Sequence, residues 1–185
     1  MLIGVISDTH GSLTAWAKAI NDCFSKVDLI LHGGDVLYHG PRNPMPDGYQ
    51  PAALSSAMNS CPVPILICRG NCDSDIDQQM LEIPIQSPYV LVWIDRLKAM
   101  LLHGDGLTEE DLSALTSRYR LDILITGHTH IHRILEGEGY IILNPGSPSL
   151  PKGDKKRTIG MIDTSERSAR VIDVESGDLL EYIKW

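Results

Sequence analysis

The chain has 185 residues, enough for one domain with a sizeable core, and its 43% hydrophobic and 22% charged residues are ordinary globular values. Its formal net charge of −8 argues against a protein that coats long DNA or RNA, because such binding needs clustered lysines and arginines facing phosphates. A phosphate ester stays open as a substrate, since bound metal ions can reverse the local field. We expect a single domain over residues 1–185, without linker or internal repeat.

In the first half of the chain, short apolar runs alternate with segments whose apolar residues have helical spacing. Apolar runs that end in small or polar residues predict buried strands over 2–7, 28–32 and 64–68. Helices are expected over 12–24, with Ser12 as the N-cap, and over 52–59. No charged leader or long apolar segment precedes the first strand, which predicts a cytoplasmic protein without a membrane partner.

An irregular segment, LYHGPRNPMPDGYQP, holds four prolines between about residues 36 and 51. Long loops on a rigid scaffold often carry recognition, but a mobile surface loop is an equally good reading. Tyr38, His39 and Arg42 are its candidates for shaping a pocket. The segment 36–50 and the C-terminal residues 182–185 either cover the surface of a partner copy, giving a homo-oligomer, or fold back on the chain.

The second half changes to a strand-rich pattern. A hairpin over 89–95 and 97–103 is followed by a helix that begins after Thr108, which with Asp111 forms a capping pair, and by a strand over 122–126. Five more strands are then expected, at 132–136, 140–143, 158–163, 170–174 and 179–183. Early β/α alternation followed by strands indicates two packed sheets with helices outside.

Seven potential metal ligands follow the ends of these strands. They are Asp8 and His10 in SDTHG, Asp35 in HGGDV, Asn71 in RGNCD, His103 in LLHGD, and His128 and His130 in TGHTH. In a layered α/β fold such strand ends converge at one edge of the sheet. Carboxylate, imidazole and amide oxygen together suit borderline divalent cations. The pattern therefore predicts a two-metal hydrolase site.

Each motif is weak when it stands alone. In an extended backbone, residues two apart project to the same side, so Asp8 with His10 and His128 with His130 are expected to work in pairs. The Gly-Gly pair before Asp35 lets the backbone approach closely, although a plain turn explains it equally well. Asn71 after glycine is, by itself, a turn residue. The order of all the motifs, each after a strand, carries the prediction.

Taken together, the motifs resemble the calcineurin-like metallophosphoesterases, whose signature is D-x-H, G-D, G-N-H-[DE], H and G-H-x-H. The resemblance covers about the first 150 residues, and the compact length with Asn144-Pro145-Gly146-Ser147 places the chain near the small bacterial phosphodiesterases of the YfcE type. It implies a four-layer αββα sandwich of two mixed β-sheets flanked by helices.

The resemblance also implies the ligand sets and the reaction. The first ion would take Asp8, His10, Asp35 and His130, and the second would take Asp35, Asn71, His103 and His128. The ions are most often manganese in bacterial members, with iron, zinc or nickel as alternatives. A water molecule activated between two such ions would attack a small phosphodiester in a single in-line displacement, without a covalent intermediate.

The segment after the third strand holds the other expected site residues. Asn71, Cys72 and Asp73 are predicted to act at the catalytic step, and Arg69 and Asn71 to contact the substrate, although Arg69 pairs equally well with Asp73. Cys72 stands where the family has histidine, and a thiol is a poorer acid near pH 7 than imidazolium. We therefore expect weak action on alkyl monoesters and better action on diesters with acidic alcohols. Cys72 as a space-filling residue or a ligand stays open.

Three alternatives use the same pattern. A phosphomonoesterase would share the metals, and a nuclease acting on a cyclic nucleotide or a short oligonucleotide is compatible with the acidic charge. A scaffold on the same fold, as the retromer subunit that resembles this family is thought to be, could lose ligands freely. Every ligand position here holds a competent residue, which favours catalysis.

Overall fold

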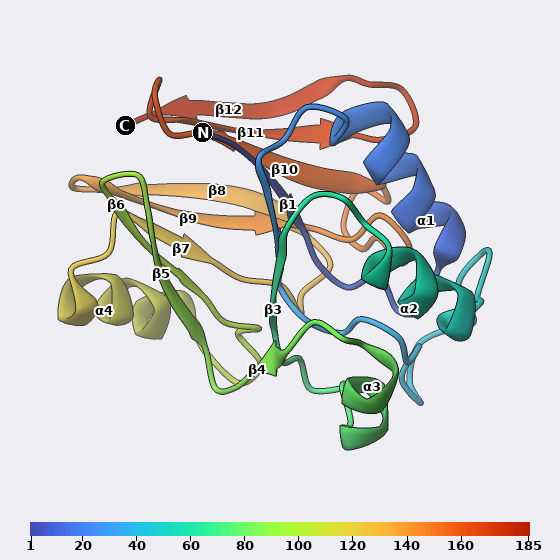
Figure 1. Ribbon diagram of the computed structural model, residues 1–185. Coiled ribbons are helices and arrows are strands. Elements are labelled where there is room, and N and C mark those ends of the chain that lie inside the picture. The colour runs from blue at the N-terminus through green and yellow to red at the C-terminus, as the bar shows by residue number, and fades with distance from the viewer.

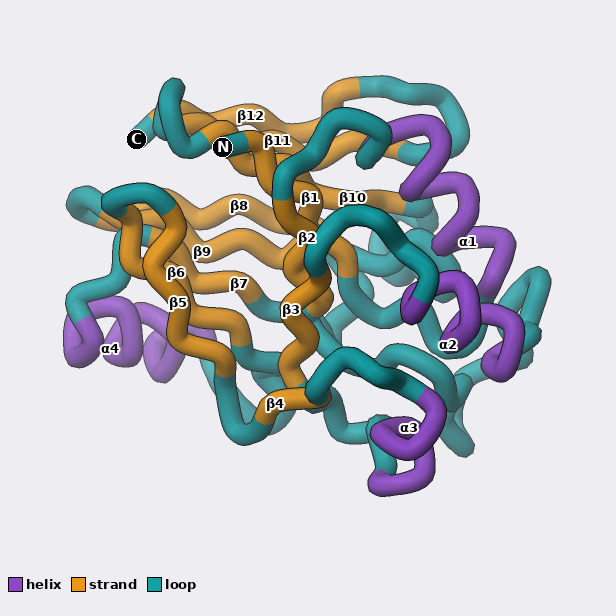
Figure 2. The backbone as a smooth tube through the Cα atoms, in the orientation of Figure 1, coloured by secondary structure: helices purple, strands orange, loops and turns teal.

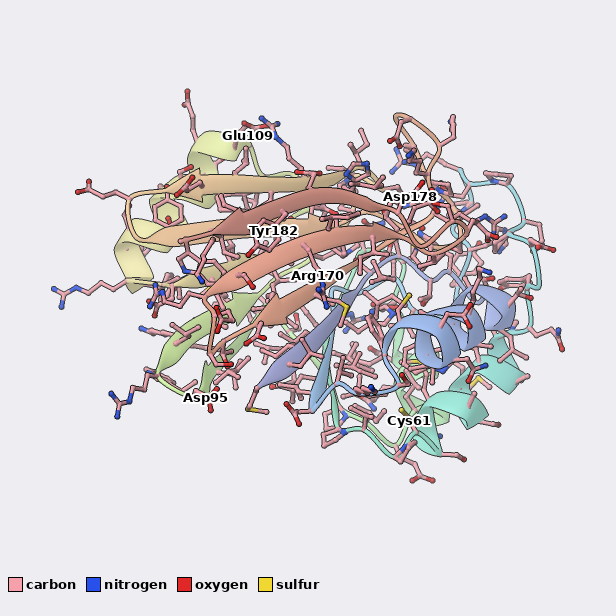
Figure 3. The ribbon with its side chains drawn as sticks, turned by 90° about the horizontal axis from the view of Figure 1, so that it is seen from above. Cys61, Asp95, Glu109, Arg170, Asp178 and Tyr182 are labelled. Atoms are coloured by element: carbon pink, nitrogen blue, oxygen red, sulfur yellow. The ribbon has the colours of Figure 1, made fainter.

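Two β-sheets lie face to face in the computed structural model, which describes residues 1–185, and helices cover their outer faces (Figure 1). The expected four-layer αββα sandwich of mixed sheets is confirmed. Seen from above, Glu109 at the start of one outer helix and Cys61 after another lie on opposite sides of the strands (Figure 3). The N- and C-termini lie near one another (Figure 2).

The first sheet has seven strands. Their spatial order is β12 (Leu179–Lys184), β11 (Ser168–Asp173), β10 (Thr158–Asp163), β1 (Leu2–Ile6), β2 (Leu29–His32), β3 (Ile65–Cys68) and β4 (Ile85–Gln86). Strands β1 to β4 run parallel to one another, whereas β10 runs antiparallel to β1. The carboxyl ends of β1, β2 and β3 therefore lie at one edge.

The second sheet has five strands. Their order is β5 (Val90–Ile94), β6 (Leu97–Leu101), β7 (Ile123–Ile125), β9 (Tyr140–Pro145) and β8 (His132–Gly137). Strands β6, β7 and β9 are parallel, and β5–β6 and β8–β9 form antiparallel pairs. The loops after β6 and β7 consequently leave this sheet at a common edge.

The helices divide between the two outer faces (Figure 1). They are α1 (Leu13–Lys18), continued by the π-helical turn η1 (Ala19–Cys23), α2 (Pro51–Asn59), α3 (Asp75–Met80) and α4 (Glu109–Tyr119). Ser12 caps α1 and Thr108 caps α4, as expected, and the Asp111 carboxylate accepts a hydrogen bond from the Thr108 N–H. No helix combines the length and apolarity needed to cross a bilayer.

Two apolar clusters hold the layers together. One lies between the sheets and joins residues such as Ile3 and Val171 to Leu101 and Leu143, all almost fully buried. The other lies between the first sheet and helices α1 and α2, around Phe24. Burial of apolar side chains on both faces explains why the central strands are continuous apolar runs.

Three elements depart from the sequence expectation. Helix α3 and the two-residue strand β4 were not expected, and the first helix ends in a π-turn rather than continuing as a regular helix. The C-terminus folds back, since the Trp185 N–H donates to the Arg167 carbonyl and the Arg167 side chain donates to the Trp185 carbonyl. The segment 36–50 lines a cavity, described below.

Candidate metal centre

The predicted ligands lie together at the edge of the sandwich where five strands end. Asp8 and His10 follow β1, Asp35 follows β2, Asn71 follows β3, His103 follows β6, and His128 and His130 follow β7. All except Asn71 and His128 are buried. Three overlapping groups of these side chains and Cys72 have ligand atoms within 4.8 Å of one another.

The first donor set surrounds His130. Its Nε2 lies 3.2 Å from Asp8 Oδ1 and 3.2 Å from His10 Nε2. His10 Nε2 is also 3.8 Å from Asp8 Oδ1 and 3.7 Å from Asp35 Oδ2. Two imidazoles and two carboxylates thus face one small volume.

The second donor set surrounds Asn71. Its Oδ1 lies 2.8 Å from His128 Nδ1 and 3.2 Å from His103 Nε2. His103 Nε2 is in turn 3.4 Å from Asp35 Oδ2. This set combines two imidazoles, an amide oxygen and the same Asp35 carboxylate.

Asp35 belongs to both sets through one atom. Its Oδ2 faces His10 on one side and His103 on the other, whereas its Oδ1 accepts a hydrogen bond from the Cys72 N–H at 2.8 Å. Gly70 makes this contact possible, because a Cβ there would overlap Asp35 Oδ1. The carboxylate is therefore oriented so that a single oxygen is shared.

Backbone carbonyls orient three of the histidines. The Nδ1–H groups of His10, His103 and His130 donate to the carbonyls of Tyr38, Gly33 and Leu150 at 2.8, 2.8 and 2.6 Å. A carbonyl can only accept, so Nδ1 carries the proton and Nε2 is the atom turned to the site. Metal-binding histidines are commonly held in this way.

The first set fits a cation. Asp8 Oδ1 is buried without a hydrogen-bond partner, and the Nε2 atoms of His10 and His130 direct lone pairs toward each other. An unpartnered buried carboxylate oxygen is costly. A divalent ion bound by these atoms would satisfy all of them.

Electrostatic interactions keep the carboxylates ionised. Burial opposes this, but the close approach of the His130 ring and the charge of His103 hold the pKa of Asp8 below its usual value. Burial likewise disfavours a charged His103, yet its contact with Asp35 and the charge of Asp8 raise its pKa to about 9. His103 therefore carries a proton that a bound ion would displace.

The loop conformation differs from the extended backbone that the sequence suggested. Asp8, His10, Asp35, His128 and His130 all have positive φ, between 46° and 67°. The same-side argument for the two pairs was therefore wrong. Tertiary hydrogen bonds hold the first pair instead, from the Asp8 and His10 N–H groups to the Gly34 and Asp35 carbonyls, at 3.0 Å each. Strain of this kind clusters at functional sites.

Several supporting residues escaped the sequence analysis. Ser7 Oγ donates to Asp8 Oδ2 at 2.6 Å, and the Oγ atoms of Ser147 and Ser149 each donate to the Asp8 carbonyl at 2.8 Å. Asn144 Nδ2 donates to the Gly127 carbonyl at 2.7 Å. The Asn-Pro-Gly-Ser motif thus holds in place the loops that carry Asp8 and His128. The motif itself was the sequence signal that could have identified Asn144 and Ser147 as supporting residues.

His32 is buried nearby but turned away from the donor sets. Its Nε2–H donates to Thr9 Oγ1 at 3.0 Å, and its Nδ1 accepts from the Gly34 N–H at 3.1 Å. Complete burial lowers its pKa to about 4. A neutral histidine with both nitrogens satisfied acts as a structural residue.

The remaining predicted residues take different positions. Cys72 lines the cavity over the centre, and its Sγ accepts a hydrogen bond from Asn71 Nδ2 at 3.3 Å. Burial, followed by the charge of Asp35, raises the Cys72 pKa to about 12. Arg69 does not line that cavity, because its guanidinium bonds the Asp73 carbonyl and the Asp75 carboxylate. Substrate contact by Arg69 stays a prediction.

A cavity of about 620 Å³ opens over the donor sets. Its floor includes Asp35, Asn71, Cys72, His128 and His130. Its walls come from Tyr38, Gly40, Pro41, Arg42 and Asn43 in the irregular segment, and from Lys152. The irregular segment thus lines the site, which agrees with its interpretation as a recognition loop rather than a mobile surface loop.

Comparisons with known proteins agree with this arrangement. A family model described as the calcineurin-like phosphoesterase superfamily domain matches residues 1–167. The chain is 38% identical over 173 residues to phosphodiesterase YfcE of Escherichia coli K12, and the alignment covers 92% of this chain and 91% of that protein. The solved structure of the E. coli phosphoesterase YfcE aligns with a TM-score of 0.87 at 34% identity, over 99% and 98% of the two chains.

A more distant likeness concerns the fold alone. Vacuolar protein sorting 29 from Cryptosporidium parvum aligns with a TM-score of 0.73 at 20% identity, over 100% of this chain and 98% of that one. The fold by itself therefore does not separate an enzyme from a protein of another kind, and the donor sets must decide.

Proposed function

The chain belongs to the calcineurin-like phosphoesterase superfamily, as its motifs predict, and from this premise we propose that it is a metal-dependent phosphodiesterase. The observation that carries the proposal is the meeting of two donor sets at the shared Asp35 Oδ2. The name of the E. coli relative, a phosphodiesterase, supports the same activity.

We assign a divalent ion to each donor set. Asp8, His10, Asp35 and His130 would hold one, and Asp35, Asn71, His103 and His128 the other. Mixed imidazole, carboxylate and amide donors suit manganese, iron, zinc or nickel, and manganese is our choice among them. When bound, such ions supply Lewis acidity for activating water and for offsetting charge on phosphate oxygens.

The protein's own residues prepare the site for one in-line displacement. Asn71 contributes a neutral oxygen, which adds no negative charge against an approaching phosphate. Cys72 has no hydrogen-bonded base, since the group on its Sγ is the Asn71 amide donor. A nucleophile needs such a base or a lowered pKa. We therefore propose direct attack by water, with no covalent intermediate on a side chain.

The identity of residue 72 supports diesters over monoesters. A thiol is a weaker proton donor near pH 7 than the histidine that the family has at this position. Loss of a general acid costs most when the leaving alcohol is poor. Diesters of acidic alcohols are thus the proposed substrates, and alkyl monoesters the poor ones.

The test compares Asp35→Asn with Asp105→Asn, which changes an exposed carboxylate two residues after His103. Wild type is expected to bind two equivalents of Mn²⁺ and to hydrolyse bis(p-nitrophenyl) phosphate faster than an alkyl monoester such as ethyl phosphate. Asp35→Asn should lose about 100-fold or more in rate together with bound metal, whereas Asp105→Asn should keep both. Metal binding without hydrolysis of any ester would favour a scaffold, and a monoester preference would favour a phosphomonoesterase.

A further inference from the structure

Two cationic side chains lie on the walls of the cavity over the donor sets, and neither has a partner within the protein. Arg42 belongs to the irregular segment after β2, and Lys152 belongs to the loop after β9. Both side chains are exposed, and neither forms an ion pair or a side-chain hydrogen bond within the protein. Other cations, such as Lys18 and Lys184, pair with carboxylates.

Each of these loops is fastened to a candidate ligand. The carbonyl of Tyr38, four residues before Arg42, accepts the His10 Nδ1–H at 2.8 Å. On the other wall the His130 Nδ1–H donates to the Leu150 carbonyl at 2.6 Å, and the Lys152 N–H donates to the His130 carbonyl at 3.0 Å. Hydrogen bonds to His10 and His130, which belong to the first donor set, therefore hold in place the backbone that carries each cation.

The turn that carries Arg42 is also closed locally. Asn43 Nδ2 donates to the His39 carbonyl at 2.9 Å, and the His39 ring lies edge-on between the rings of Tyr38 and Tyr49, with centroids 4.8 and 5.3 Å away. Tyr38 itself lines the cavity and is 39% exposed. Its free face can stack on a planar group such as a nucleobase.

The placement of these cations bears on the charge of the substrate. A phosphodiester carries one negative charge, and the donor sets below already receive it if the proposed function holds. Unpaired cations held over that site, in a chain of net charge −8, are available to a second anion. Arginine and lysine bind phosphate through charge-assisted hydrogen bonds.

We propose that the substrate is a phosphodiester in which one alcohol carries a second anionic group, a phosphate or its equivalent, and that Arg42 and Lys152 bind this group. The inference rests on the proposed function and adds the class of alcohol. Arg42 and Lys152 are then specificity determinants that do not touch the reacting atoms.

The test uses a matched pair of substrates with the same scissile bond. These are the p-nitrophenyl ester of thymidine 5′-phosphate and the same ester bearing a 3′-phosphate. Wild-type protein loaded with Mn²⁺ should show about tenfold higher kcat/KM for the compound with the 3′-phosphate, chiefly through KM, and the preference should shrink as salt is added.

Variants locate the effect. Arg42→Ala with Lys152→Ala should abolish the preference, and Arg42→Lys with Lys152→Arg should retain it. The control is Lys155→Ala with Lys156→Ala, because these lysines lie in the same loop but do not line the cavity. Calorimetry should show the same pattern for thymidine 3′,5′-bisphosphate against thymidine 5′-monophosphate, with about tenfold weaker bisphosphate binding in the Arg42/Lys152 alanine variant.

The outcomes separate this inference from the proposed function. If wild type hydrolyses neither ester, the proposed function fails. Hydrolysis of both with equal kcat/KM overturns the inference alone. An equal loss of preference in the Lys155/Lys156 control would assign the effect to the general field of the loop, and would also overturn it.

Discussion

The Asp73 carboxylate holds the backbone of Asp35 in place. Asp73 Oδ2 accepts the Asp35 N–H at 2.9 Å, and its Oδ1 accepts the next N–H, that of Val36, at 2.7 Å. The Gly70 N–H also donates to Oδ2, at 2.7 Å. Since Asp73 is buried, this geometry makes it a positioning residue for Asp35.

Replacing Asp73 with Asn should weaken both the fold and the metal centre. An amide offers one acceptor oxygen, so its NH₂ group would face a backbone N–H and leave it unsatisfied. The free energy of unfolding should fall by about 1–3 kcal/mol. Divalent-ion affinity, measured by calorimetry at a temperature where the variant is fully folded, should fall as well. Unchanged affinity would show that Asp73 serves the fold alone.

Asp75→Asn is the matched control for that change. Asp75 lies two residues on, is highly exposed and pairs only with Arg69. An exposed ion pair contributes about 0–1 kcal/mol, so stability should change little and ion affinity not at all.

Replacing Cys72 with His should shift the enzyme toward monoesters. An imidazolium in the cavity restores a proton donor for poor leaving groups, and the ratio of alkyl monoester to diester turnover should rise by at least about tenfold. The Sγ atom already packs against Gly40, so the larger ring must point into the cavity. Steady-state kinetics on both ester classes give the ratio, and Cys72→Ala should leave it as in wild type. An unchanged ratio in Cys72→His would end the general-acid explanation.

His132 should make stability depend on pH. Its Nδ1 lies 2.6 Å from Glu181 Oε1 and its Nε2 lies 3.2 Å from Asp154 Oδ2. Burial lowers the His132 pKa, but the two carboxylates outweigh it, and the net shift is upward. A raised pKa in the folded state means that the stabilisation is complete below the unfolded value of about 6.5 and is lost as pH rises through the folded value.

Urea unfolding of wild type and His132→Gln, both with chelator, measures this contribution. The difference in free energy of unfolding should be about 1 kcal/mol near pH 5.5 and should shrink above pH ~7. Chelator removes the pH dependence of metal binding from the comparison. A difference that is flat with pH would show that the three groups are not coupled.

The layers and the meeting of the donor residues could be predicted because both follow from short-range patterns. Apolar runs mark the central strands, and the polar residue after each run marks the sheet edge. Helix α3 offered the same kind of signal, since Ser74 and Asp77 form a capping box like that of Thr108 and Asp111. It was missed because only six residues follow the cap, without an apolar face.

The rest depends on tertiary contacts that have no local pattern. Strand β4 has two residues and exists only through its pairing with β3. The left-handed conformations of Asp8 and His10 are held by hydrogen bonds that their N–H groups donate to carbonyls of the loop after β2, far along the chain. Ser147 and Ser149 likewise meet the Asp8 carbonyl only in the folded chain, so no local sequence pattern could reveal their roles.

The most direct measurement is the anomalous scattering of crystals grown with saturating Mn²⁺. We predict two adjacent peaks per chain, one among Asp8, His10 and His130 and the other among Asn71, His103 and His128, with Asp35 bound to both. A single peak, or density that leaves Asp35 outside either coordination sphere, would contradict this prediction.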